Sequence, residues 1–128
     1  MNKVVLDASA LLALIKNEPG AQIVEAFLGN IIMSSVNLAE VGSVLIDCGM
    51  TAEECEECIE PFIDSIVPFD TDQAFIVASL KKLTKHKGLS LGDRACIALG
   101  IKSKAKIYTA DKVWAELNIK GADIGLIR

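Results

Sequence analysis

The segment Val4-Val5-Leu6-Asp7-Ala8-Ser9 decides how the chain folds. Its three apolar residues, two of them β-branched, predict a short strand that is buried on both faces. The apolar run 10–15 predicts a helix, with Asp7 or Ser9 as its N-cap. In an open parallel sheet, ligands bind outside the carboxyl ends of the strands, which is where Asp7 lies. Asp7 is therefore either a reactive acid or only a helix cap, and this segment alone favours neither.

The composition predicts one domain, spanning residues 1–128, with a largely aliphatic core. Of the 128 residues, 52% are hydrophobic and 5% are aromatic, which is enough apolar side chain to build a core. No apolar run approaches the roughly 18 residues of a membrane span, and the N-terminus does not resemble a signal peptide. We therefore expect a cytoplasmic protein with no membrane partner.

Charge is distributed unevenly along the chain. The formal net charge of −4 argues against broad electrostatic binding of nucleic acid. Residues 47–72 contain nine acids and no Lys or Arg, which is typical of a solvated helix face. Residues 81–106 contain eight bases and one acid. This basic block, with the Lys81–Lys87 cluster and Arg94, is either another solvated face or a track for a polyanion, and for Arg94 itself we favour a surface ion pair.

The four cysteines do not predict a disulfide framework, because a chain of this length can bury a core without one. Cys55 and Cys58 have the spacing of a metal or redox pair. However, a zinc site needs four ligands and His86 is the only histidine, while a redox pair normally follows a strand. We therefore interpret both cysteines as small apolar residues on one face of an acidic helix from Thr51 to about Ile63.

Strand-like and helix-like segments alternate along the rest of the chain. Further strands are predicted at 31–34, 66–69, 107–109 and 124–127. The helices between them include two with apparent start signals at Asn37 and Ser90. The helix from Arg94 to about Lys102 is apolar nearly all round, which is typical of a buried helix. This alternation predicts a three-layer α/β/α sandwich around a central, mostly parallel sheet of four to five strands.

Four acids fall at positions that such a sheet brings together. Asp7 and Asp111 each follow a predicted strand, and Glu40 and Asp93 each lie in the first turn of a predicted helix. Strand carboxyl ends and the starts of the following helices share one edge of a doubly wound sheet, so all four carboxylates are expected to face one cleft. Taken singly, Glu40 and Asp93 are equally well explained as first-turn residues that stabilise their helices.

Four clustered carboxylates predict a site for a hard divalent cation. Crowded carboxylates repel one another unless they are protonated or neutralised. Oxygen ligands without His or Cys select ions such as Mg²⁺ or Mn²⁺, which hold phosphate substrates and activate water. The chain has no glycine-rich phosphate loop, and His86 lies beside no nucleophile motif. We therefore interpret Ser9 as a hydroxyl of a metal or phosphate site rather than as a nucleophile.

The four acids lie in four blocks of sequence, at residues 4–14, 35–41, 89–96 and 108–114. In their order and spacing these blocks resemble the PIN domain, and more closely the VapC-type ribonuclease toxins of prokaryotic toxin–antitoxin pairs. The resemblance covers essentially the whole chain, and all four acidic positions match.

The resemblance implies a PIN-like fold and a Mg²⁺- or Mn²⁺-dependent endoribonuclease. It implies a metal-binding and catalytic quartet, supported by the hydroxyls of Ser9 and Thr109. The members of this quartet are Asp7, Glu40, Asp93 and Asp111. It further implies an RNA substrate, a homodimer, and a small antitoxin whose tail covers the acidic cleft.

Two other functions compete with this interpretation. A Mg²⁺-dependent phosphoryl-transfer protein, either a haloacid-dehalogenase-like phosphatase or a receiver domain, would also use Asp7. The phosphatase pattern needs a second Asp where Ser9 stands, and a receiver would have only Lys112 as a loose candidate for its lysine. The other competitor is an inactive RNA-binding or interaction module, against which four intact acids argue. Cleavage of DNA stays open, because the metal chemistry does not require a 2′-hydroxyl.

Overall fold

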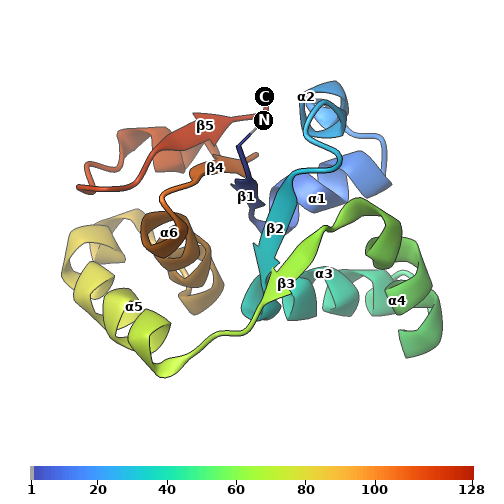
Figure 1. Ribbon diagram of the computed structural model, residues 1–128, viewed down its shortest axis with the longest axis horizontal. Coiled ribbons are helices and arrows are strands. Elements are labelled where there is room, and N and C mark those ends of the chain that lie inside the picture. Colours follow the sequence, from blue (N-terminus) through green and yellow to red (C-terminus); the bar gives the residue numbers. More distant parts are fainter. Residues whose placement is uncertain (1) are drawn as a thin grey trace.

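Five short strands, rich in β-branched residues, form one sheet in the computed structural model, which describes residues 2–128 (Figure 1). They are β1 (Val4–Leu6), β2 (Ile31–Ser34), β3 (Ser65–Val67), β4 (Lys106–Thr109) and β5 (Ile124–Leu126). Their order in the sheet is β3-β2-β1-β4-β5, and every neighbouring pair is parallel. The predicted α/β/α sandwich is confirmed, with five strands, all of them parallel.

Helices cover both faces of this sheet. The α-helices are α1 (Ala8–Ile15), α2 (Ala21–Glu25), α3 (Ser35–Asp47), α4 (Ala52–Ile59), α5 (Thr71–Thr84) and α6 (Leu91–Ser103). Three 3₁₀ helices are η1 (Glu60–Phe62), η2 (Lys85–Lys87) and η3 (Lys112–Glu116). Within residues 2–128, no helix combines the length and the apolar character needed to cross a bilayer.

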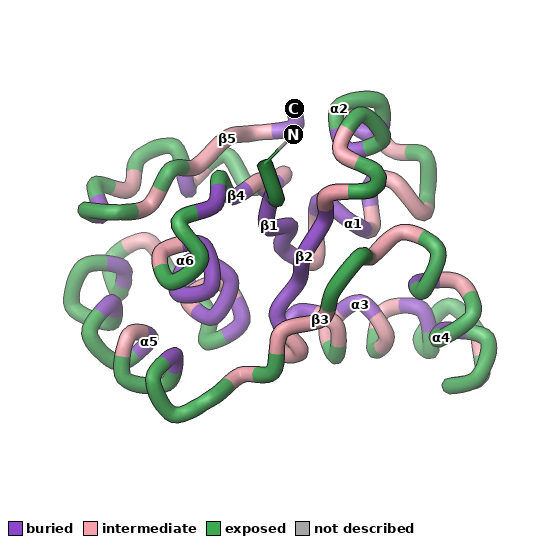
Figure 2. The backbone as a smooth tube through the Cα atoms, in the orientation of Figure 1, coloured by how far each residue is buried: buried purple, intermediate pink, exposed green. Residues whose placement is uncertain are grey.

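The core has two halves, because successive side chains of a strand point to opposite faces of the sheet. Val4 and Leu6 of β1 pack into the half that is covered by α1, α2, α3 and α4. Val5 of β1 and Ile107 of β4 pack into the other half, under α5, α6 and η3. Burying one such side chain fully contributes about 1.5–3 kcal/mol. β1 and β2 are buried on both sides, whereas β4 has an exposed Lys106 and a half-buried Tyr108 (Figure 2).

Helix α6 is buried nearly all round, as its sequence predicts. Small residues let it lie close to the sheet, and a side chain at Gly100 would collide with Ile107 of β4. The close packing places the first turn of α6 at the carboxyl ends of the strands. Figure 2 shows α6 as the most continuously buried helix.

Helix α3 begins earlier than the sequence suggests. Its N-cap is Ser34, whose hydroxyl accepts a hydrogen bond from the backbone N–H of Val36, and the strand β2 runs into the helix without a loop. Asn37 is therefore not the N-cap, and Glu40 lies in the second turn rather than the first. Ser34 takes the cap position because a Ser hydroxyl satisfies the exposed N–H groups as well as an Asn side chain does.

The acidic helix is shorter than predicted. Thr51 and Glu54 form the expected capping box, but α4 ends at Ile59 and continues as the 3₁₀ turn η1, in which Pro61 has no N–H to donate. Cys55 is buried in the core and Cys58 packs against it, both as free thiols. This confirms their interpretation as apolar helix residues.

Candidate metal centre

The candidate site lies where the strand order of the sheet reverses. The chain passes from β1 to β2 and β3 on one side, then returns to place β4 on the other side of β1. Ligands of open α/β sheets bind at such a switch point, outside the carboxyl ends of the strands. Asp7 directly follows β1, and Thr109 is the last residue of β4. The predicted reactive edge therefore coincides with the topological switch.

Asp7 is buried, and its two carboxylate oxygens are held by three donors. Oδ1 accepts from the hydroxyl of Ser9 at 2.7 Å and from the backbone N–H of Ala10 at 2.9 Å. Oδ2 accepts from the hydroxyl of Thr109. The bond from Ala10 makes Asp7 the N-cap of α1, so the acid is a helix cap and also lies at the switch point. The two explanations of Asp7 are compatible.

The hydroxyls that hold Asp7 are themselves oriented by the backbone. Ser9 Oγ accepts from the N–H of Ala110 at 2.9 Å, and Thr109 Oγ1 accepts from the N–H of Asp111 at 3.0 Å. A hydroxyl has a single hydrogen to donate, and in both residues it is directed at Asp7. The loop after β4 is thus tied to the carboxylate through two hydroxyls.

The pKa of Asp7 is raised from its usual value of 3.8 to about 6, mainly by burial and to a smaller extent by the negative charge of Asp93. The hydrogen bonds from Thr109, Ala10 and Ser9 act in the opposite direction, because they stabilise the ionised form. The net direction shows that desolvation outweighs these three donors. A cation beside the carboxylate would reverse it.

Glu40 and Asp93 approach this edge from two different helices. Glu40, half-buried on α3, accepts a hydrogen bond at Oε1 from the Nδ2 of Asn37 at 2.8 Å. Its carboxylate lies against the Cα of Gly92, where a Cβ would collide with it. Asp93 completes a capping box with Ser90, whose backbone N–H donates to Asp93 Oδ2 at 2.9 Å. The capping role of Asp93 is thus real and engages one of its two oxygens.

The thiol of Cys96 lies within the electrostatic influence of three of these acids. It is fully buried in α6, and burial raises its pKa well above the ordinary range. The negative charges of Asp7, Asp93 and Glu40, in that order, raise it further. Cys96 is therefore a neutral thiol close to three carboxylates that come from three separate elements.

Asp111 lies at the rim of this group. It is exposed, and its Oδ1 accepts from the backbone N–H of Val113 at 3.0 Å, as the N-cap of η3. The structure thus gathers three of the four predicted acids about Cys96 and places the fourth beside them. Within residues 2–128, no three His, Cys, Asp or Glu side chains lie close enough together to share one metal ion. The acids share an edge without forming a closed coordination sphere.

The residues at this edge nevertheless fit a hard divalent cation. In the part of the chain that the structure describes, none of the four acids forms a salt bridge. Their oxygens are the ligand type that Mg²⁺ and Mn²⁺ prefer, and a neutral Cys96 does not compete as a thiolate. Asp7, Glu40 and Asp93 are the candidate ligands, with Asp111 beside them, and in the arrangement described they would have to move closer or act through bound water to share one ion. The ion would supply the positive charge that the site lacks.

The sequence reasoning missed two residues at this edge. The sequence predicts Asn37 as a helix cap, although its spacing of three residues from Glu40 is the spacing at which side chains on a helix meet. Gly92 carries no side chain and so gave no chemical signal, yet its missing Cβ is what leaves room for Glu40.

Within residues 2–128, Arg94 forms no salt bridge of the kind expected from the sequence. Its guanidinium donates from Nη1 to the backbone carbonyl of Val77 in α5, at 3.2 Å. The side chain therefore ties α6 to α5, and the predicted surface ion pair is wrong. Within the Lys81–Lys87 cluster, Lys87 pairs with Glu116 at 3.0 Å.

Comparisons with known proteins agree with this architecture. The PIN domain family matches residues 4–120 of the chain. The fold is similar to a DNA-bound VapBC from Salmonella typhimurium, with a TM-score of 0.75, 18% identity and 100% of both chains covered. It is also similar to VapBC-5 from Mycobacterium tuberculosis, with a TM-score of 0.66, 23% identity, and 100% of this chain and 99% of that chain covered. No curated protein matches the sequence.

Proposed function

The chain belongs to the PIN domain family, and we propose that it is a Mg²⁺- or Mn²⁺-dependent endoribonuclease that hydrolyses RNA phosphodiester bonds. The observation that carries this proposal is the approach of Asp7, Glu40 and Asp93 to one buried thiol at the switch point, with no basic group paired to them in residues 2–128. Uncompensated acids at a ligand-binding edge call for a cation, and a hard cation suits a phosphate substrate.

The cation and the side chains around it would each contribute one property to the proposed reaction. A bound cation would neutralise charge on the phosphoryl oxygens and lower the pKa of a water. Asp7 is oriented by three donors before any ligand arrives, so it needs little rearrangement to bind. Ser9 and Thr109 hold Asp7, and their hydrogens are directed at it, which favours supporting roles for both hydroxyls over nucleophilic attack.

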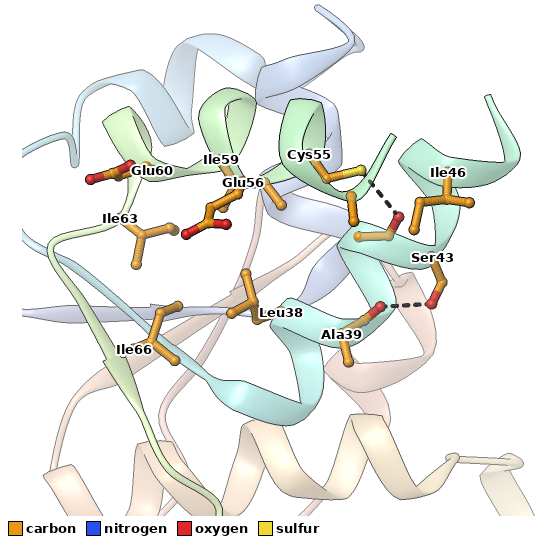
Figure 3. A pocket seen from close by; sticks show the side chains of 12 residues that line it. Leu38, Ala39, Ser43, Ile46, Cys55, Glu56, Ile59, Glu60, Ile63 and Ile66 are labelled. Atoms are coloured by element: carbon orange, nitrogen blue, oxygen red, sulfur yellow. Dashed lines mark hydrogen bonds between the residues drawn. The ribbon is translucent and has the colours of Figure 1, made fainter. Parts of the chain in front are cut away.

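We further propose that the protein is the toxin of a toxin–antitoxin pair. Similarity in fold to VapBC proteins supports this proposal, and so does an apolar groove between α3 and α4 (Figure 3). The groove encloses about 560 Å³, and its walls include Leu38 and Ile46 of α3 and Ile59 of α4. Apolar grooves of this kind receive the apolar face of a partner helix.

Charge identifies the partner chemistry that this groove fits. Glu56 and Glu60 line it from the α4 side, and neither forms a salt bridge within residues 2–128 (Figure 3). The groove residues include no Lys or Arg. We propose that the antitoxin docks here with a basic amphipathic helix, whose apolar face fills the groove and whose cations meet these two acids.

A homodimer remains part of the proposal. Phe75 of α5 is 73% exposed and Leu91 at the start of α6 is 55% exposed, which are large values for side chains of this size and polarity. These two exposed side chains are the positions of α5 and α6 at which we propose to test for a contact between copies of the chain.

The decisive experiment compares wild-type protein with Asp7→Asn, purified identically and freed of any bound partner. Both are incubated with structured and single-stranded RNA in Mg²⁺, in Mn²⁺ and in chelator. We expect metal-dependent cleavage by the wild type and at least about a thousandfold less by the variant, because a ligand to the cation contributes several kcal/mol. A single-stranded DNA arm shows whether the sugar matters.

Three outcomes would contradict the proposal. Near-normal cleavage by a folded Asp7→Asn protein would remove the role of Asp7. Metal binding without cleavage, together with labelling of Asp7 by acetyl phosphate, would support the phosphoryl-transfer alternative instead. RNA binding that chelation does not affect would support the inactive module.

A further inference from the structure

We propose that Asn37 and Gly92 together form a cradle that positions the carboxylate of Glu40 beside Asp93, and that this cradle sets the affinity of the site for a divalent cation. In this arrangement Asn37 is a positioning residue that acts through Glu40. The inference rests on the proposed metal-binding role of the acids.

Asn37 is joined to both sides of the site. It is 1% exposed, on α3, and its Nδ2 donates to Glu40 Oε1 at 2.8 Å and to the backbone carbonyl of Gly92 at 3.0 Å. Both partners are acceptors, so only the amide nitrogen can face them, and the orientation of the side chain is determined. One side chain thus connects Glu40 to the first turn of α6.

The other end of the Asn37 amide is unsatisfied. Its Oδ1 is buried and has no hydrogen-bond partner within residues 2–128. Leaving a buried carbonyl oxygen unpaired costs about 1–3 kcal/mol, which the two hydrogen bonds donated by Nδ2 offset in part. A half-satisfied buried amide needs an explanation, and for Asn37 the bonds from Nδ2 to Glu40 and to Gly92 supply one.

Gly92 provides the second half of the cradle. It is the second residue of α6, and a Cβ there would overlap the Oε1, Oε2 and Cδ atoms of Glu40. The carboxylate therefore lies flat against the backbone of α6, one residue before Asp93. Glycine is otherwise unfavourable inside a helix by about 1 kcal/mol relative to alanine, which indicates that the space is needed.

Electrostatics explain why Glu40 needs holding. Its carboxylate lies against Gly92, which directly precedes Asp93, and the charge of Asp93 also acts on Asp7, so like charges lie near one another. A Glu side chain on a half-exposed helix face would otherwise turn towards water, away from this repulsion. The Asn37 amide and the positive end of the α6 dipole oppose that movement. The cradle thus keeps a flexible acid in place before a cation binds.

The test measures Mn²⁺ affinity directly, by electron paramagnetic resonance titration of metal-free protein. We expect Asn37→Ala to weaken Mn²⁺ binding by about 10- to 100-fold, the usual effect of losing a residue that orients a metal ligand. Asn37→Ser, which retains one hydroxyl donor, should restore part of the affinity. The Mn²⁺ spectrum should also differ between wild type and Asn37→Ala, since Glu40 would no longer be held in its place.

Gln73 provides a matched control. It is also a fully buried amide on a helix, and its nitrogen is bonded to the backbone carbonyl of Pro68, while its Oε1 has no partner within residues 2–128. Gln73→Ala should lower the melting temperature as Asn37→Ala does, while Mn²⁺ affinity stays at the wild-type value. This control separates a loss of stability from a loss of positioning.

Gly92→Ala covers the case in which Asn37→Ala does not fold. Alanine suits a helix better than glycine, so the helix gains while Glu40 is displaced, and Mn²⁺ affinity should again fall about 10-fold or more. Wild-type Mn²⁺ affinity in Asn37→Ala or in Gly92→Ala would overturn this inference alone. Absence of Mn²⁺ binding by the wild-type protein would overturn the proposed function and this inference together.

Discussion

Helix α3 borders two regions of opposite character, the acidic edge at the β1–β4 switch and the apolar groove beside α4. Towards the edge it presents Asn37 and Glu40, and towards the groove it presents Leu38, Gly42 and Ile46. At the edge, buried Asp7 has each of its oxygens engaged by donors. In the groove, the side chains are mostly hydrocarbon, and Ile46 is half exposed.

The difference shows how one helix can serve chemistry on one side and association on the other. Orienting charges needs directional hydrogen bonds and a dry environment, since the strength of a charge interaction rises as water is excluded. Docking of a partner helix needs apolar area and general charge complementarity, which tolerate small displacements. The two regions should therefore respond to different kinds of substitution.

The largest effect that we expect at the acidic edge is a pH dependence of the free energy of unfolding, caused by Asp7. Its pKa in the folded protein is about 6, above the value of 3.8 for an unfolded chain, so the folded state binds the proton more tightly. The resulting stability is present below pH 3.8 and is lost as pH rises through about 6. It amounts to about 3 kcal/mol at full strength.

Urea unfolding of metal-free protein between pH 4 and pH 8 measures this loss. Asp7→Asn should remove most of the decline over that range, because the amide does not ionise. Mg²⁺ should stabilise the wild type above pH 6 and leave the variant unchanged. Parallel pH profiles for the two proteins would contradict the burial argument for Asp7.

A second prediction separates the role of the Thr109 hydroxyl from the packing of its side chain at the same edge. Thr109→Val keeps the shape of the side chain but leaves Asp7 Oδ2 and the N–H of Asp111 without their partner. We expect cleavage to fall by about 10- to 100-fold. In the wild type the hydrogen bond from Thr109 lowers the pKa of Asp7, so its loss should raise that pKa. The acid limb of the pH–activity profile of Thr109→Val should therefore move to higher pH. Thr109→Ser should restore most of the activity, and equal activity in the Val and Ser variants would exclude a role for the hydroxyl.

A third prediction breaks the groove without touching the edge. A synthetic amphipathic helical peptide, with Leu on one face and Lys on the other, should bind the wild type more tightly than the same peptide carrying Glu. Ile46→Asp should weaken the binding of the Lys peptide by about tenfold, because apolar contact is lost. The matched control is Ile23→Asp, which changes a similarly exposed residue of α2 outside the groove. Fluorescence anisotropy measures the affinity of the Lys peptide for each variant. An equal loss of affinity in Ile46→Asp and Ile23→Asp would argue against a specific groove.

The smallest expected effect is a loss of stability on substitution of Cys58. This residue of α4 packs against the half of the core that contains Val4 and Leu6. Cys58→Ala should lower the free energy of unfolding by about 1 kcal/mol or less, as the loss of a small, partly buried apolar group does. Metal affinity and RNA cleavage should stay at wild-type values. Stoichiometric zinc in the wild type that disappears in this variant would instead support the metal-pair alternative for Cys55 and Cys58.

Much of the fold follows from local pattern, and particular residues show where the pattern stops. β-branched runs and capping signals predict the strands and the boxes at Thr51 and Ser90, because these depend on neighbours in sequence. The predicted start of α3 at Asn37 is wrong because Ser34 and Asn37 are both acceptable N-caps, and the length of β2 decides between them. The interpretation of Arg94 failed because its partner, the Val77 carbonyl, lies in another helix.

The sequence by itself determined the sheet, the buried character of α6 and the acids that follow β1 and β4, because strand and helix periods and the ends of elements are local properties. Only the tertiary structure decided which acids face one another. It placed Asp7, Glu40 and Asp93 near Cys96 and left Asp111 at the rim. It also revealed the cradle of Asn37 and Gly92, whose contact spans 55 residues of sequence. Such a contact depends on the close packing of α3 against α6, which no local pattern encodes.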